Sequence, residues 1–215
     1  NKKWAFFPSA ALRWNVANEP FMKNAMRVDD LALRLSAGMT GNDAISPYRS
    51  LAALSSTTGG YLFDGSQPAA YYLSRLDSPD LTWEKTASYN AALDIALFKN
   101  RLNITAEAYY SKTSDLLLSV QVPTQTGFSS RFGNIGKTSN KGFELTIESQ
   151  NIMKKNFSWS TTLTLSHNKQ RVEDIGSEDF VKALSAPGNN SYMMYGYVKG
   201  YPLNALWGFK YGGVW

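Results

Sequence analysis

Residues that could carry out catalysis are sparse in this sequence. His167 is the single histidine and there is no cysteine, which excludes a multi-histidine metal site and a cysteine–histidine nucleophile pair. Glu144 and Glu148 have the chemistry of a glycosidase pair, but on one strand they lie about 13 Å apart, which is too far. The glycine-containing segment 133–137 lacks the spacing of a phosphate-binding loop. We therefore predict no enzyme activity, no metal site and no cofactor.

Aromatic side chains in segments rich in Gly, Ser, Asn and Pro are the remaining candidates for a binding site. Such rings can stack on sugars or anchor a partner protein. The alternative is that they only pack the loops against one another. The candidate ligand or partner contacts are Tyr61, Phe63, Tyr71, Tyr72, Phe128, Phe132, Tyr192 and Tyr195.

Strict alternation of apolar and polar residues predicts the elements that position these loops. From Trp83 to Leu97 one parity is mostly apolar and the other mostly polar, as in a strand with two different faces. The same pattern resumes after Lys99-Asn100, so the two strands form a hairpin. The predicted strands are residues 10–16, 31–37, 83–97, 102–111, 143–150, 157–166 and 205–211.

The connections between these strands alternate in length. Short ones cover about 17–30, 99–100 and 151–156, and long ones cover 40–80, 113–140 and 168–204. In an up-and-down meander every second connection lies at the same end of the sheet. One end therefore carries the short connections and the other end the long ones. This asymmetry is typical of outer-membrane barrels, which have short periplasmic turns and long extracellular loops.

The composition agrees with a membrane-spanning β-sheet and argues against a transmembrane helix and a nucleic-acid-binding protein. The chain lacks a run of 18 apolar residues, so no transmembrane helix is expected, whereas a spanning strand needs only about 9–11 residues. The net charge of +5 comes from scattered residues, which argues against nucleic-acid binding. We predict an all-β fold, an antiparallel up-and-down segment of a transmembrane β-barrel.

Short motifs in a fixed order give a family resemblance. They include Phe6-Phe7-Pro8-Ser9, Leu33-Arg34-Leu35-Ser36 leading to Thr40-Gly41-Asn42, Leu81-Thr82-Trp83-Glu84, Asn100-Arg101-Leu102, Thr113-Ser114-Asp115-Leu116-Leu117, Asn134-Ile135-Gly136 and Asn140-Lys141-Gly142-Phe143-Glu144. In this order and spacing they resemble the SusC/RagA family of TonB-dependent transporters of Bacteroidetes outer membranes.

The resemblance implies a barrel of about 22 strands, closed by an N-terminal plug and covered by a SusD-like surface lipoprotein. It implies import of oligosaccharides or peptides driven through TonB. Residues 1–215 would be part of the barrel domain, about six or seven of its strands, without a plug domain or signal peptide in this chain. The implied partners are the lipoprotein, TonB through parts outside these residues, a glycan or peptide substrate, and membrane lipid.

A soluble β-sandwich that binds glycans through its loop aromatics is the alternative function. The two hypotheses differ in where the apolar parity lies. In a barrel wall it faces lipid, and in a sandwich it is sealed between two sheets. The discriminating residues are Leu93, Ile95, Leu97, Leu145, Ile147, Leu163 and Leu165.

Overall fold

The structure divides into two compact units. It is a computed structural model that describes residues 4–23, 27–43, 46, 48–58, 65, 69–176, 193–195, 198–203, 205–208 and 212–213. Unit 1 consists of residues 1–6, 41–85 and 114–136, and unit 2 consists of residues 7–40, 86–113 and 137–215.

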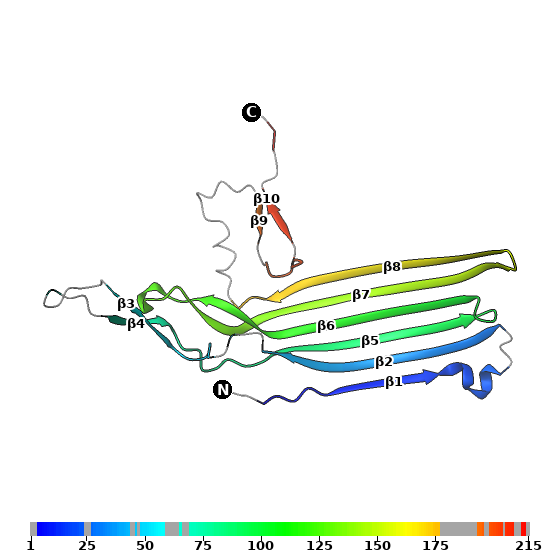
Figure 1. The fold of residues 1–215 in the computed structure, drawn as a ribbon, viewed down its shortest axis with the longest axis horizontal. Coiled ribbons are helices and arrows are strands. Elements are labelled where there is room, and N and C mark those ends of the chain that lie inside the picture. Colours follow the sequence, from blue (N-terminus) through cyan, green and yellow to red (C-terminus); the bar gives the residue numbers. More distant parts are fainter. Residues whose placement is uncertain are drawn as a thin grey trace. The chain divides into compact units, whose positions relative to one another are not determined.

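A six-stranded sheet, most of which belongs to unit 2, is the main element of the fold. Its strands are β1 (Ser9–Asn15), β2 (Val28–Asn42), β5 (Glu84–Leu97), β6 (Leu102–Gln121), β7 (Ser130–Lys154) and β8 (Phe157–Asp174). Their order in the sheet is β1-β2-β5-β6-β7-β8, and neighbouring arrows alternate in direction (Figure 1). The predicted antiparallel up-and-down arrangement is confirmed.

In the register of β7 against β8, the apolar residues of both strands lie on one face and the polar residues on the other. Leu145 lies opposite Leu165 and Ile147 opposite Leu163, so these side chains share a face. The intervening pair is Thr146 and Thr164, which shares the other face. The alternation read from the sequence therefore becomes one apolar and one polar face.

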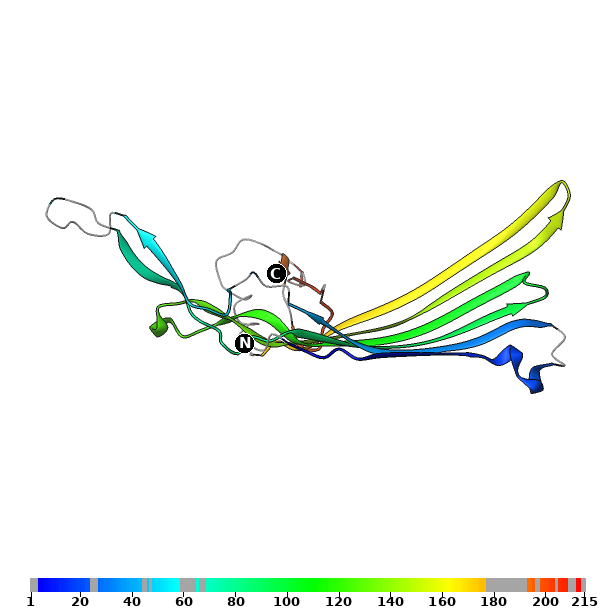
Figure 2. The same cartoon turned by 60° about the horizontal axis from the view of Figure 1, so that its bottom comes forward.

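Unit 2 presents its long strands as a single layer (Figure 2). Leu163 and Leu165 are 47% and 49% exposed, and the buried apolar residues among those described are only Ala32, Leu81, Ala92, Val172 and Ile175. The discriminating leucines and isoleucines are thus not sealed between two sheets within the described part of the chain. This is the outcome expected of a barrel wall.

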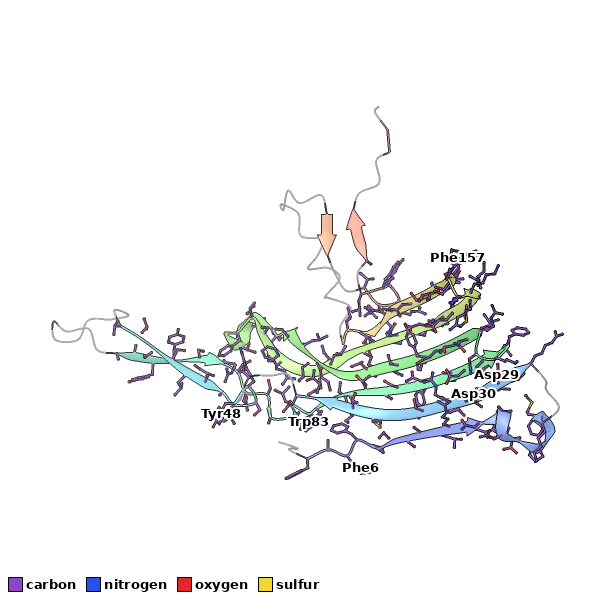
Figure 3. All side chains as sticks on the ribbon, turned by 45° about the vertical axis from the view of Figure 1, so that its right-hand side comes forward. Phe6, Asp29, Asp30, Tyr48, Trp83 and Phe157 are labelled. Atoms are coloured by element: carbon purple, nitrogen blue, oxygen red, sulfur yellow. The ribbon has the colours of Figure 1, made fainter. Side chains whose placement is uncertain are left out.

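The short connections lie at one end of unit 2 (Figure 1). The first contains two single-turn 3-10 helices, η1 (Val16–Asn18) and η2 (Pro20–Met22). The β5–β6 turn uses positive φ angles at Phe98, Lys99 and Asn100. Figure 3 places Phe157, which follows the β7–β8 turn, at the same end as Asp29.

The β7–β8 turn is tighter than the predicted 151–156 segment. Strand β7 continues to Lys154, and the turn is Lys155-Asn156. A register shift between Gln150 and Ile152 breaks the alternation, which explains why the sequence pattern ended the strand too early.

The long connection 40–80 contains a hairpin that the alternation did not predict. Strand β3 (Ala53–Thr57) pairs antiparallel with β4 (Ala70–Arg75). The Arg75 guanidinium donates to the carbonyl oxygens of Tyr48 at 3.0 Å and Leu51 at 3.2 Å. The strands are short, so too few alternating residues were available to reveal them.

The prediction of a long loop over 113–140 is wrong. Strand β6 continues to Gln121 and β7 begins at Ser130, leaving a connection of about residues 122–129 that contains η3 (Thr124–Thr126). Asp115 adopts a φ of 60° within β6. This left-handed residue interrupts the extended backbone and the alternation with it, so the run Leu116-Leu117-Leu118 did not resemble a strand.

The last predicted loop, 168–204, is also shorter than expected at its start because β8 runs through His167 to Asp174. Strand β9 (Met193–Tyr195) pairs antiparallel with β10 (Leu206–Gly208). Strand β10 lies within the predicted strand 205–211. No helix among the described residues is long and apolar enough to cross a membrane.

Candidate functional site

The two faces of unit 2 differ in chemistry across β1 and β2 as well. Leu12 lies opposite Leu35 and Trp14 opposite Leu33, whereas Arg13 lies opposite Arg34. We call the side that carries Leu12, Trp14, Leu163 and Leu165 the apolar face, and the side that carries Arg13, Arg34 and Thr164 the polar face. The two arginines would repel each other directly across the strands, so the polar face needs a counter-charge there.

Asp94 of β5 supplies this counter-charge. Its carboxylate forms a bidentate pair with Arg34, with Nε–Oδ2 at 2.7 Å and Nη2–Oδ1 at 3.1 Å. Arg13 Nη1 lies 3.7 Å from Asp94 Oδ2, and the Thr105 hydroxyl of β6 donates to Oδ1 at 3.3 Å. This polar network, consisting of Arg13, Arg34, Asp94 and Thr105, links four strands on one face.

A close packing of Tyr109 against Gly142 joins β6, β7 and β8 on the polar face. The Tyr109 hydroxyl donates to Asn168 Oδ1 at 3.3 Å. A Cβ at Gly142 would collide with the His167 carbonyl oxygen and would lie 2.6 Å from the Tyr109 hydroxyl oxygen. Only glycine therefore fits at this position, a requirement that no alternation pattern could reveal.

The apolar face along β7 and β8 is aromatic at its ends. Between them lie aliphatic residues and one polar group, Ser149, Asn151 and Thr161, whose side chains hydrogen-bond to one another. On β8, Phe157 and Trp159 follow the turn, Leu163 and Leu165 come after Thr161, and His167 contacts Phe143 with ring centroids 5.8 Å apart. Other large, exposed side chains of unit 2 on this face are Leu12, Trp14, Leu35, Tyr89, Leu93 and Tyr110. A soluble protein rarely exposes so extended an apolar patch, so this face is a contact surface.

Within unit 1, the Asn134 side chain hydrogen-bonds to the backbones of two other segments. Its Oδ1 accepts from the Thr82 N–H at 2.8 Å, and its Nδ2 donates to the Thr82 carbonyl at 2.8 Å. The same Nδ2 donates to the Asp115 carbonyl at 2.7 Å. One side chain of β7 thereby ties the segment that precedes β5 to the outer part of β6.

Glu84 makes a second connection of the same kind. Its Oε1 accepts from the Leu117 N–H at 2.8 Å, and its Oε2 accepts from Asn42 Nδ2 at 3.1 Å. Lys85 Nζ lies 3.3 Å from Asp115 Oδ2. We call Asn42, Thr82, Glu84, Asp115 and Asn134 the loop anchor.

The loop anchor brings together four of the motifs that carry the family resemblance. The order of these motifs is visible in the sequence, but their meeting in space is not. Gly136 lies two residues after Asn134. A Cβ at this position would lie 2.8 Å from Leu118 Cδ1 and 2.9 Å from Leu116 Cβ, so a larger residue would require these side chains to move.

The predicted aromatic contacts whose side chains the structure describes lie on β4, on β7 and in the connection that precedes β7. Tyr71 and Tyr72 are 74% and 53% exposed but are successive residues of β4, so they point to opposite faces of the hairpin. Phe132 is half-buried and stacks with Arg49, whose Cζ lies 5.2 Å from the ring centroid. Phe128 is half-buried in the connection after η3.

The other predicted contacts cannot be placed as side chains. Tyr61, Phe63 and Tyr192 lie outside the described residues, and for Tyr195 only the backbone, in β9, is described. Among the described residues, no group of three or more His, Cys, Asp or Glu could hold a metal ion.

Comparisons with known proteins match the whole chain. Residues 1–214 match the family described as TonB dependent receptor-like, beta-barrel. TonB-dependent receptor P26 of Formosa agariphila is 38% identical over 100% of this chain, and TonB-dependent receptor SusC of Bacteroides thetaiotaomicron is 31% identical over 96% of it. This chain spans 21% of each of those proteins.

Solved structures agree with the sequence relatives. The structure of the RagAB peptide importer in the closed-closed state superimposes with a TM-score of 0.73 at 27% identity. The match covers 92% of this chain and 21% of that one. A second structure, described as the RagAB peptide transporter, gives a TM-score of 0.73 at 28% identity over 94% of this chain and 21% of that chain.

Proposed function

Because this chain belongs to the TonB dependent receptor-like β-barrel family, we propose that it forms about a fifth of an outer-membrane transporter of the SusC/RagA type. In this proposal unit 2 is barrel wall, with its apolar face in lipid and its polar face toward the lumen. The chain has no catalytic role and needs no cofactor.

The height of the apolar face carries this proposal. On β8 the face runs from Phe157 to His167, and Lys169 follows on the same side. A strand that advances about 3.4 Å per residue and tilts about 40° rises about 26 Å over this distance. Outer-membrane barrels have an apolar band about 25 Å tall with aromatic girdles at both edges, and the aromatic ends of this face match those girdles.

The polar network supports the lumenal direction of the opposite face. A charged side chain on the lipid side near the bilayer midplane costs about 2–4 kcal/mol. Arg34 and Asp94 keep 41% and 23% of their side chains exposed in the layer. A water-filled lumen would hydrate these exposed parts, while the ion pairs hold the strands in register.

The relatives support a proposal for cargo and partners. SusC and the RagAB peptide importer lead us to propose oligosaccharides or peptides as cargo, a SusD-like lipoprotein as lid and TonB as energy source. The long connections would lie outside the cell. The exposed rings of Tyr71 and Tyr72 would contact cargo or lid, with Tyr61, Phe63, Phe128, Phe132, Tyr192 and Tyr195 as further contacts.

Uptake by cells tests the proposed function. A strain lacking the full-length gene would be grown with defined oligosaccharides or with peptides as the limiting nutrient. We expect growth on one of these cargo classes to fail and to return when the intact gene is restored. Unchanged growth and unchanged outer-membrane uptake on both classes would contradict the proposed transport function.

A further inference from the structure

Basic side chains follow the apolar face directly at the end opposite the tight turns. Lys141 of β7 lies opposite Lys169 of β8, one pair beyond Phe143 and His167 on the same face. The next pair on this face is Ser139 and Arg171. Three cations therefore project from two neighbouring strands immediately beyond the last aromatic pair.

Lys112 of β6 adds a fourth cation to the same face. The Tyr109 hydroxyl bonds to Asn168, which lies opposite Gly142 on the polar face. Since successive side chains of a strand alternate, Tyr110 and Lys112 project from the apolar face. We call Lys112, Lys141, Lys169 and Arg171 the cationic belt.

The cationic belt is exposed and lacks counter-ions in the described part of the chain. All four side chains are exposed, and none forms an ion pair with a described residue. The acidic residue of β8 on this face is Glu173, which lies beyond Arg171. Its carboxylate accepts a hydrogen bond from Ser139 Oγ at 2.6 Å. Within the residues that the structure describes, the belt therefore has unpaired positive charge next to an apolar surface.

The position of the belt identifies the kind of ligand. Below it, the apolar face needs hydrocarbon, and long basic side chains at its edge extend toward the headgroup layer. Each cation near an anionic membrane surface strengthens association about fivefold. Charge complementarity at this height fits the phosphate of an anionic lipid better than a dissolved anion, because the lipid chains would occupy the apolar face at the same time.

We propose that the cationic belt, Lys112, Lys141, Lys169 and Arg171, binds the phosphate of an anionic lipid headgroup at the membrane surface. This inference rests on the proposed function, since it requires the apolar face to lie in lipid. The lipid chains pack along Tyr110, Phe143 and Leu165, and the headgroup phosphate contacts the cations above them.

Native mass spectrometry of the full-length protein in detergent tests the proposal. The protein would be titrated with phosphatidylglycerol or with zwitterionic phosphatidylcholine. The variant Lys141→Gln/Lys169→Gln/Arg171→Gln removes three charges, and the matched control Lys141→Arg/Lys169→Arg/Arg171→Lys keeps them. We expect the protein to bind phosphatidylglycerol preferentially, the charge-removing variant to bind it at least about tenfold more weakly, and the control to bind it within about twofold of the unmodified protein.

Two further measurements distinguish failure of the lipid-binding proposal from failure of the proposed function. An excess of inorganic phosphate should leave the bound phosphatidylglycerol in place, and displacement by phosphate would overturn the lipid assignment in favour of a free-anion site. Equal binding of both lipids, or equal binding by both variants, would also overturn it. A spin label at Leu163→Cys in nanodiscs reports lipid contact independently. Lipid contact without headgroup selectivity refutes only the belt, whereas a water-exposed label refutes the proposed function as well.

Discussion

Replacing Asp94 by asparagine should destabilise the sheet, because Asp94 forms ion pairs with two arginines that face each other, Arg13 and Arg34. Only Arg13 has a second acidic partner among the described residues, Asp30 at 3.7 Å. The bidentate contact with Arg34 would be lost, and Arg13 and Arg34 would remain opposed across β1 and β2. Asp94→Asn keeps the size of the side chain, so the effect would report charge rather than packing.

The magnitude follows from the exposure of the pair. Exposed ion pairs contribute about 0.2–1 kcal/mol, and Arg34 is 41% exposed, so the lost bidentate pair costs about 1 kcal/mol. Like charges directly opposite each other add about 0.5 kcal/mol. The free energy of unfolding should therefore fall by about 1.5 kcal/mol in low salt. In about 1 M salt the screening length shrinks to about 3 Å, so the difference should decrease to about half.

Urea unfolding of the full-length protein in detergent, followed by tryptophan fluorescence, measures this difference. The matched control is Glu148→Gln, which removes one negative charge from an exposed position of β7 and should change the free energy of unfolding by less than about 0.5 kcal/mol. Adding Arg13→Gln to Asp94→Asn should recover part of the loss. Equal effects of Asp94→Asn and Glu148→Gln, or no dependence on salt, would refute the counter-charge role of Asp94.

Three further outcomes are expected of the full-length protein. Asn134→Ala removes three hydrogen bonds, each worth about 1 kcal/mol, so limited proteolysis within residues 41–85 should be several times faster than in the unmodified protein. Gly142→Ala should lower the yield of folded protein, measured by heat-modifiable mobility on gels, and Tyr109→Ala in the same protein should restore it only in part because the backbone collision remains. Leu163→Lys should destabilise the membrane-embedded protein by about 2–4 kcal/mol in urea unfolding, whereas the neighbouring Thr164→Lys should cost less than about 1 kcal/mol.

The long hairpins were predictable because their alternation is nearly unbroken. Strands β5 and β6 show it from Glu84 to Tyr110, and a period of two has few other physical explanations. Where the backbone departs from regular extension, at Asp115 and between Gln150 and Ile152, the parity changes. The sequence pattern then predicted loops in place of strand ends.

The polar network and the loop anchor could not be predicted from alternation, because both depend on the register between strands. Asp94 meets Arg34 only when β2 and β5 are aligned at one particular offset. Asn134 and Thr82 are 52 residues apart in the chain. Neither residue type indicates from the sequence that the Asn134 amide hydrogen-bonds to the Thr82 backbone. Composition alone predicts the aromatic contacts, and composition does not indicate the face on which a ring lies, as Tyr71 and Tyr72 show.

The direction of the apolar face is the central claim, and paired cysteine labelling tests it most directly. The full-length protein in lipid nanodiscs would carry a nitroxide spin label at Leu163→Cys or, one residue further along β8, at Thr164→Cys. Collisions with oxygen, which concentrates in lipid, and with a water-soluble nickel chelate would be measured for each label. The barrel-wall account predicts lipid exposure at residue 163 and water exposure at residue 164. Water exposure at both positions, or the reverse assignment, would contradict it.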